Sequence, residues 1–175
     1  MTTNTLTKLL LASIALTFAI GCKSTPAPKP TTTASAQYPA RPTTPPPPVT
    51  LYHQYNDNFT LVTTPTATDA QIEAIIWQLR TAAHTHTFDK IGIPQKLVDA
   101  RAPMAWFHIY RGPKCADEKY TDGKLPCGGS YHAAGDYTFG GGANNQWDDG
   151  ALLHGDDHET ELWNPNAPYT SPSTN

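Results

Sequence analysis

Four side chains with acid, base or metal-binding chemistry fall on two neighbouring segments of the chain. His108 and Tyr110 stand two residues apart in one segment, and His132 and Asp136 stand four apart in the next. Side chains alternate between the two faces of a β-strand, so this even spacing places the members of each pair on one face. Imidazole and carboxylate groups gathered there can bind a divalent metal or transfer protons.

Two predicted strands carry these side chains. The first is Met104 to Arg111, followed by Gly-Pro, and the second is Ser130 to Phe139, preceded by Gly-Gly. We take the hairpin as symmetric about Cys115 and Cys127. The facing pairs are then Tyr110 with His132, His108 with Ala134, and Trp106 with Asp136. The alternate residues form an apolar face expected to lie under a helix: Phe107, Ile109, Ala133, Gly135, Tyr137 and Phe139. Both predictions depend on register.

The same residues also suit a surface without chemistry, because aromatic and polar cross-strand pairs stabilise any half-exposed sheet. We therefore interpret the face as a binding surface on which Trp106 and Tyr110 supply contact area at low entropic cost. The alternative is a metal-binding protein or metal-dependent hydrolase that uses His108, His132 and Asp136. No resident cofactor is predicted, and a divalent metal belongs to the alternative alone.

Two further histidine pairs have simpler interpretations. His84 and His86 follow a predicted helix, where imidazolium interacts favourably with the helix dipole. His154 and His158 have the spacing of a helical metal pair, but Gly155 disfavours a helix between them.

Sequence motifs of known catalytic or nucleotide-binding sites are lacking. The residues around Ser130 do not form GxSxG, and the chain contains neither GxGxxG nor GxxxxGK followed by Ser or Thr. No Lys or Arg follows Lys124, whereas seven acidic residues do. This acidic C-terminal third argues against nucleic acid as a partner, because phosphate binding needs clustered cations.

The first 21 residues are typical of an export signal. Lys8 precedes Leu9 to Ile20, an apolar run that is too short to span a bilayer and that fits a signal-peptide core. The residues Ala19-Ile20-Gly21-Cys22 that follow resemble the lipobox of bacterial lipoproteins. That resemblance implies cleavage before Cys22 and attachment of acyl chains, such as palmitate, to this residue. Lys23 is not the Asp that favours inner-membrane retention in enterobacterial lipoproteins, so the resemblance favours the outer membrane.

The remaining cysteines agree with export. With Cys22 lipidated, Cys115 and Cys127 form an even pair, which should be oxidised outside the cytoplasm. Their loop predicts a stabilisation of roughly 3 kcal/mol in the chain-entropy model. Zinc is a poor alternative, since there is no CxxC and no suitably placed histidine.

Composition divides the mature chain into three parts. Residues 22–49 carry nine of the seventeen prolines and predict a disordered, extended spacer that reaches up to roughly 80 Å. Residues 50–153 form the expected globular domain, and residues 154–175 an acidic tail expected to be disordered.

The domain should be α+β. Phe59 to Thr63 reads as a strand, and Thr68 with Gln71 forms a capping box before a helix from Asp69 to about Ala83. With the hairpin this predicts strand-helix-strand-strand: one helix packed on a small antiparallel sheet, with one hairpin closed by a disulfide.

Function is predicted only at the level of class. We expect an exported envelope protein, anchored by lipid on Cys22, that acts as a non-catalytic binding module for an envelope protein, a glycan or a small ligand. A purely structural stabiliser of the envelope is a further alternative.

Overall fold

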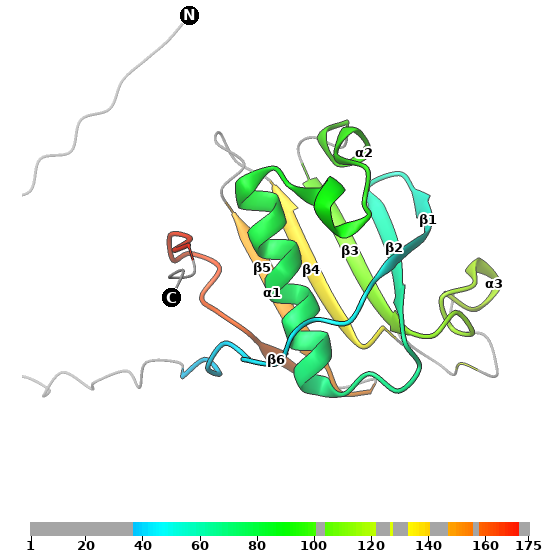
Figure 1. The fold of residues 1–175 in the computed structure, drawn as a ribbon. Coiled ribbons are helices and arrows are strands. Elements are labelled where there is room, and N and C mark those ends of the chain that lie inside the picture. The colour runs from blue at the N-terminus through cyan, green and yellow to red at the C-terminus, as the bar shows by residue number, and fades with distance from the viewer. Residues whose placement is uncertain are drawn as a thin grey trace, which may run out of the picture. The chain divides into compact units, whose positions relative to one another are not determined.

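The computed structural model describes residues 37–100, 104–121, 127, 133–140, 147–155 and 158–171. These residues form one compact unit built around a six-stranded sheet with the order β1-β2-β3-β4-β5-β6 (Figure 1). The strands are β1 Thr50–Tyr55, β2 Asn58–Thr63, β3 Met104–Arg111, β4 Gly135–Gly140, β5 Asp148–Leu153 and β6 Glu159–Glu161. The helices are α1 Asp69–Thr85, the 3-10 helix η1 Phe88–Ile91, α2 Gln95–Asp99 and α3 Glu118–Thr121.

The α+β class is confirmed, but the sheet is larger than predicted. It is also mixed rather than antiparallel, because β2 and β3 pair in parallel while every other pair is antiparallel. The chain between β2 and β3 contains α1, η1 and α2, which form the crossover that parallel neighbours require. The prediction contained β2, α1, β3 and β4, and missed β1, β5 and β6.

Helix α1 begins where the sequence predicts. The Thr68 hydroxyl accepts the backbone N–H of Gln71, and the Gln71 side chain accepts the backbone N–H of Thr68, which completes the capping box. His86 ends the helix in the left-handed conformation, with a φ of 51°. The predicted apolar stripe faces the sheet and is buried: Ile72, Ile75, Ile76, Leu79 and Ala83.

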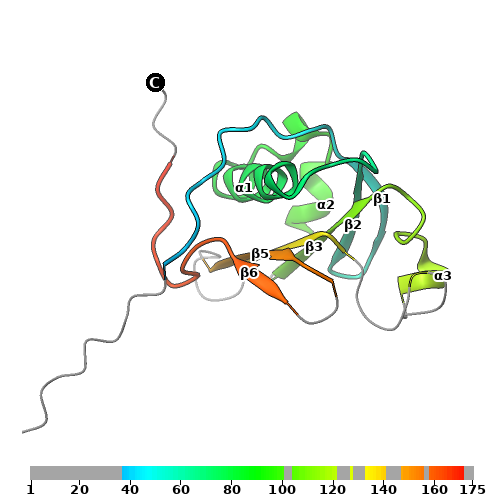
Figure 2. The same cartoon turned by 90° about the horizontal axis from the view of Figure 1, so that it is seen from below.

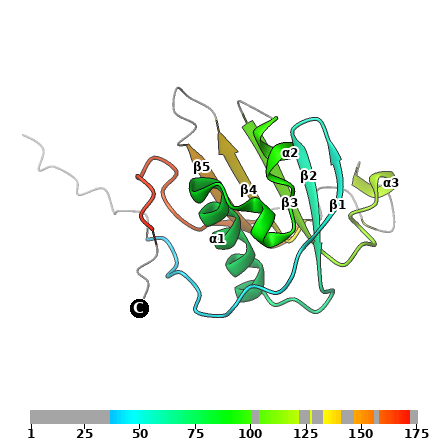
Figure 3. The ribbon, with the colours of Figure 1, turned by 45° about the horizontal axis from the view of Figure 1, so that its top comes forward.

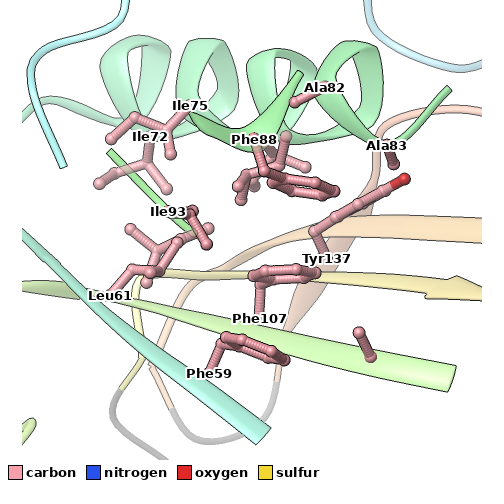
Figure 4. Close-up of a cluster of buried hydrophobic side chains, with 14 of the residues drawn as sticks. Phe59, Leu61, Ile72, Ile75, Ala82, Ala83, Phe88, Ile93, Phe107 and Tyr137 are labelled. Atoms are coloured by element: carbon pink, nitrogen blue, oxygen red, sulfur yellow. The ribbon is translucent and has the colours of Figure 1, made fainter. Parts of the chain in front are cut away.

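The core lies between α1 and one face of the sheet. Four aromatic side chains from β2, η1, β3 and β4 stack through it: Phe59, Phe88, Phe107 and Tyr137 (Figure 4). Helices α1 and α2 lie on the same side of the sheet (Figure 2), and no described helix covers the other side of β3, β4 and β5. We call this side of the sheet, which carries His108, Tyr110 and Asp136, the open face, since no helix of the described residues lies on it there.

Within β3 and β4 the predicted faces are confirmed, whereas the predicted pairs are wrong. His108 is opposite Asp136 rather than Ala134, and Trp106 is opposite Thr138 rather than Asp136. This register differs from the predicted one by two residues, and an even shift leaves the side chains of the paired residues on their predicted faces. The disulfide between Cys115 and Cys127 is present, as predicted, with the Cα atoms 5.7 Å apart.

The alternation fails just before β4. Ala133 was predicted on the face under the helix, but it packs with Tyr110 and Ala116 in a second cluster, while Ala134 belongs to the main core. Since Gly135 also faces α1, with Ile76 and Ile72 close to its backbone, two consecutive residues point toward the helix. This irregularity moves Ala133 to the open face.

The prediction of a disordered spacer is wrong for residues 37–49, which we call the strap. The strap crosses over α1 before entering β1 (Figures 1 and 3). The Arg41 guanidinium lies 5.0 Å from the Trp77 ring centroid, Val49 packs against the core, and the Pro48 carbonyl accepts the Thr63 hydroxyl. Proline fixes an extended backbone in advance, so this segment loses little entropy when it packs.

The disordered C-terminal tail is also a wrong prediction over much of its length. Glu159–Glu161 is strand β6, and Leu162 and Trp163 are buried at 1% and 5% exposure. Tyr169 stacks on His84, with ring centroids 4.1 Å apart. These residues close one end of the core. In the part of the chain that the structure describes, no helix combines the length and apolar character needed to span a bilayer.

Candidate ligand-binding site

The open face centres on His108, which is held at both ring nitrogens. Its Nδ1 lies 2.9 Å from Asp136 Oδ1, and its Nε2 lies 2.9 Å from Asn58 Oδ1. The three residues come from β3, β4 and β2, so adjacent strands supply both partners. A ring held from two sides keeps one orientation, which is what a preorganised binding or proton-transfer site requires.

Beside this histidine the face is hollowed, with a volume of about 330 Å³. Seven residues from β1, β2, β3 and α3 form its lining: His53, Tyr55, Asn58, Thr60, His108, Tyr110 and Glu118. The size lies at the lower end of the range for small-molecule sites. Planar hydrogen-bonding groups and aromatic rings dominate the lining.

His53 connects the sheet to the loop that the disulfide closes. Its Nε2 lies 3.0 Å from the Ala116 carbonyl oxygen, to which it can donate. Among the described residues its buried Nδ1 has no hydrogen-bond partner, and Glu118 Oε1 lies 3.7 Å from it. A buried nitrogen left in this state is available to a ligand or a water molecule.

Tyr110 forms the polar wall of the hollow. The side chain is only 3% exposed and packs with Ala116 and Ala133. Burial, together with the negative charge of Asp136, raises the pKa of the Tyr110 phenol to about 12. The phenol is therefore neutral at physiological pH and can both donate and accept a hydrogen bond.

The structure brings together three of the five residues predicted for this face. His108, Tyr110 and Asp136 lie close together on this face. Trp106, two residues before His108 on β3, is opposite Thr138 and is 41% exposed. His132 lies outside the described residues. Among the described residues no three His, Cys, Asp or Glu side chains are placed to hold a metal ion.

Sequence reasoning missed His53, Asn58, Thr60 and Glu118. The first three lie on β1 and β2, and β1 was not predicted because its residues, TLYHQY, mix polar and aromatic types without strict alternation. The only usable signal was Asn56-Asp57 between two runs of β-formers, a two-residue hairpin turn in which Asn56 takes a φ of 49°.

A second polar cluster, which we call the Asp148 cluster, lies on the helix side of the sheet. Asp148 is 1% exposed and accepts hydrogen bonds from Arg80 Nε at 2.9 Å and Trp163 Nε1 at 3.1 Å, and its Oδ2 lies 2.6 Å from His84 Nε2. The Arg80 guanidinium also lies 4.1 Å from the Trp163 ring centroid. His84 was assigned to the helix dipole, so this pairing is an addition to that interpretation. The described side-chain partners of Asp148 come from α1 and from the C-terminal segment, which the cluster joins to β5. The cluster therefore serves the fold.

The open-face arrangement suits binding better than nucleophilic catalysis. An Asp–His pair orients an imidazole, but a nucleophilic mechanism also needs the second ring nitrogen directed at a hydroxyl or thiol. Here the second ring nitrogen, His108 Nε2, lies 2.9 Å from the Asn58 amide oxygen, and the hydroxyl groups of the described lining are those of Thr60 and of the neutral Tyr110 phenol.

Comparison with known proteins adds no relative: no protein-family model, no curated protein and no solved structure matches the chain.

Proposed function

We propose that this chain is a lipid-anchored envelope protein whose domain binds a small polar ligand, such as a saccharide unit, on the open face of its sheet. The hollow beside His108 carries the proposal. Its lining combines amide, imidazole, hydroxyl and carboxylate groups with the rings of Tyr55 and Tyr110, and Trp106 stands exposed nearby. Ligand sites of this size use a few oriented polar groups for specificity and aromatic area for affinity.

A saccharide fits this chemistry because each hydroxyl both donates and accepts hydrogen bonds. Asn58, Thr60 and neutral Tyr110 can do the same, and His53 Nδ1 is a buried nitrogen that no described residue reaches with a hydrogen bond. Tyr55 and Trp106 are 70% and 41% exposed, and they flank Asn58 in the register of β1, β2 and β3. Neighbouring strands are about 4.8 Å apart, so these rings are separated by about the width of two sugar rings.

The anchor is proposed from the leader. Cys22 follows a signal-like run and small residues, as in lipoproteins, and acyl chains at this position would hold the domain at a membrane, with the outer membrane favoured. Mass spectrometry of the mature protein and of a Cys22→Ser variant tests this part. The variant should lose both the lipid mass and membrane retention; retention of Cys22→Ser at the membrane would contradict the anchor.

The binding proposal is tested by titrating the purified protein with saccharides prepared from bacterial envelopes. Trp106→Ala and His108→Ala should each weaken binding, by about tenfold if one well-placed contact is lost. Trp147→Ala is the matched control, because Trp147 is another exposed tryptophan, at 36%, that precedes β5 and lies outside the Tyr55–Asn58–Trp106 row beside the hollow. Equal effects of Trp106→Ala and Trp147→Ala would exclude the open face as the site.

The same preparation tests the metalloenzyme alternative. A metal-dependent hydrolase would purify with stoichiometric divalent metal, and His132→Ala would release it. Binding of saccharide to metal-free protein, unaffected by His132→Ala, is the outcome that our proposal expects.

A further inference from the structure

A second hollow lies on the other side of the sheet, between the strap and α1. Its volume is about 320 Å³, and its lining comes from three segments: the strap, α1, and η1 with the residue before it. The open-face hollow is lined by β1, β2, β3 and α3, so the two share no residue. This strap hollow belongs to a segment whose composition predicted only a spacer.

The charged groups in the strap hollow are all cations. Arg41 enters from the strap and Lys90 from η1, and the lining contains no carboxylate. Among the described residues, neither cation forms an ion pair with an acidic side chain. The nearest acid in sequence is Asp89, whose carboxylate accepts the backbone N–H of Gln95 and does not line the hollow.

The two cations are the donors that the strap hollow offers to an anion. Among the described residues, the hydrogen bond of the Arg41 guanidinium is to the Thr81 hydroxyl oxygen, 3.5 Å from Nη2 and at the outer limit of a hydrogen bond. The Thr81 hydroxyl itself donates to the Trp77 carbonyl, and the Thr87 hydroxyl lies 2.8 Å from that of Thr85, so neither threonine contributes a donor. Two cations without a carboxylate among the described lining residues suit a carboxylate or a phosphate.

The rest of the wall is apolar. Trp77 and Ile91 are partly buried and packed against the core, and Pro42 and Pro46 of the strap face them across the hollow. An inorganic ion would leave this apolar surface exposed to water, whereas an aromatic or aliphatic body would cover it.

We propose that the strap hollow is a binding site for a small organic anion, a carboxylate or phosphate with an apolar body, held between Arg41 and Lys90. This site is independent of the ligand proposed for the open face. Because one cation belongs to the strap and the other to the body of the domain, the ligand joins the two. Binding therefore also stabilises the packed strap by mass action.

The test is a calorimetric titration of the purified full-length chain with three compounds: phenyl phosphate, benzyl alcohol and inorganic phosphate. Phenyl phosphate should bind at least tenfold more tightly than benzyl alcohol, which keeps the ring without the charge. It should also bind more tightly than inorganic phosphate, which keeps the charge without the ring. Arg41→Gln and Lys90→Gln should each lower the affinity for phenyl phosphate by about tenfold, which is the loss expected for one charge-assisted hydrogen bond.

Lys96→Gln is the matched control, since Lys96 is an exposed cation on α2 that does not line the strap hollow. It should leave the affinity unchanged. Three outcomes would each overturn the proposal: no binding of phenyl phosphate, equal affinity for benzyl alcohol or inorganic phosphate, or equal losses from Lys96→Gln and Lys90→Gln. Trp106→Ala should not affect this titration, which separates its result from that of the open-face experiment.

Discussion

Replacing Asp148 by Ala should be among the most destabilising substitutions in this domain. The carboxylate is 1% exposed and accepts from Arg80 at 2.9 Å, and Arg80 is itself only 5% exposed. Removing one member of a buried ion pair costs about 3–5 kcal/mol, because the other charge stays buried without a partner. Trp163 Nε1 would also lose its carboxylate acceptor, at 3.1 Å, and keep only the longer contact to the Asp148 backbone carbonyl, at 3.4 Å. The two costs overlap because both donors share one carboxylate.

We therefore expect a loss of about 4 kcal/mol in the free energy of unfolding, a large share of the total for a domain of this size. Urea unfolding of the purified protein, followed by tryptophan fluorescence, measures it. Asp149→Ala is the control: this neighbour points to the opposite face, and in the described part of the chain its Oδ1 has no hydrogen-bond partner, so the loss should stay below about 1 kcal/mol.

A double variant separates ion-pair loss from simple packing loss. In Arg80→Met with Asp148→Leu no charge remains buried, so stability should recover by several kcal/mol relative to Asp148→Ala. Equal stability of Asp148→Ala and Asp149→Ala would refute the assignment of the cluster to the fold, and failure of the double variant to recover would refute the electrostatic explanation.

Three further predictions concern the sheet and its hairpin. Gly150→Ala should cost about 1–3 kcal/mol in urea unfolding, because the added Cβ would collide with the Trp163 ring; a neutral result would mean that the Trp163 ring moves aside freely. Tyr110 binds its proton more tightly folded than unfolded, so stability should fall as pH rises from about 10 to about 12; Tyr110→Phe should flatten that part of the curve, measured by urea unfolding at stepped pH. Reducing the Cys115 disulfide should lower the free energy of unfolding by roughly 3 kcal/mol, and an unchanged urea midpoint would contradict the loop-closure argument.

Local signals predicted the parts of the fold that local chemistry determines. The capping box at Thr68 fixed the start of α1, and period-two alternation placed His108 and Phe107 on opposite faces. The exact pairing of β3 with β4 escaped, because symmetry about the disulfide assumes a regular loop, and Ala133 and Ala134 break the alternation.

The missed elements depend on contacts between distant residues. Strand β5, DDGALL, reads as a turn, since Asp and Gly avoid strands; it is held by Arg80 on Asp148 and by the Trp163 ring over Gly150. The strap is predicted as disordered because composition does not reveal the cation–π contact between Arg41 and the Trp77 ring. In the candidate site, too, local signals identified some residues and the others depended on distant contacts. His108, Tyr110 and Asp136 were found from one hairpin, whereas His53 required knowledge that β1 exists.

The packed strap shortens the tether between the proposed lipid anchor and the domain. If Cys22 carries lipid, only residues 23–36 separate the membrane from the first described residue, Gln37. Fourteen residues span at most about 50 Å when fully extended, against the roughly 80 Å expected of the whole proline-rich segment. For a partner held beside the same anchor point, confinement to a half-sphere of that radius corresponds to an effective concentration of several millimolar. Such a partner would be bound even at about millimolar affinity, whereas a partner anchored elsewhere on the membrane would gain nothing from the tether.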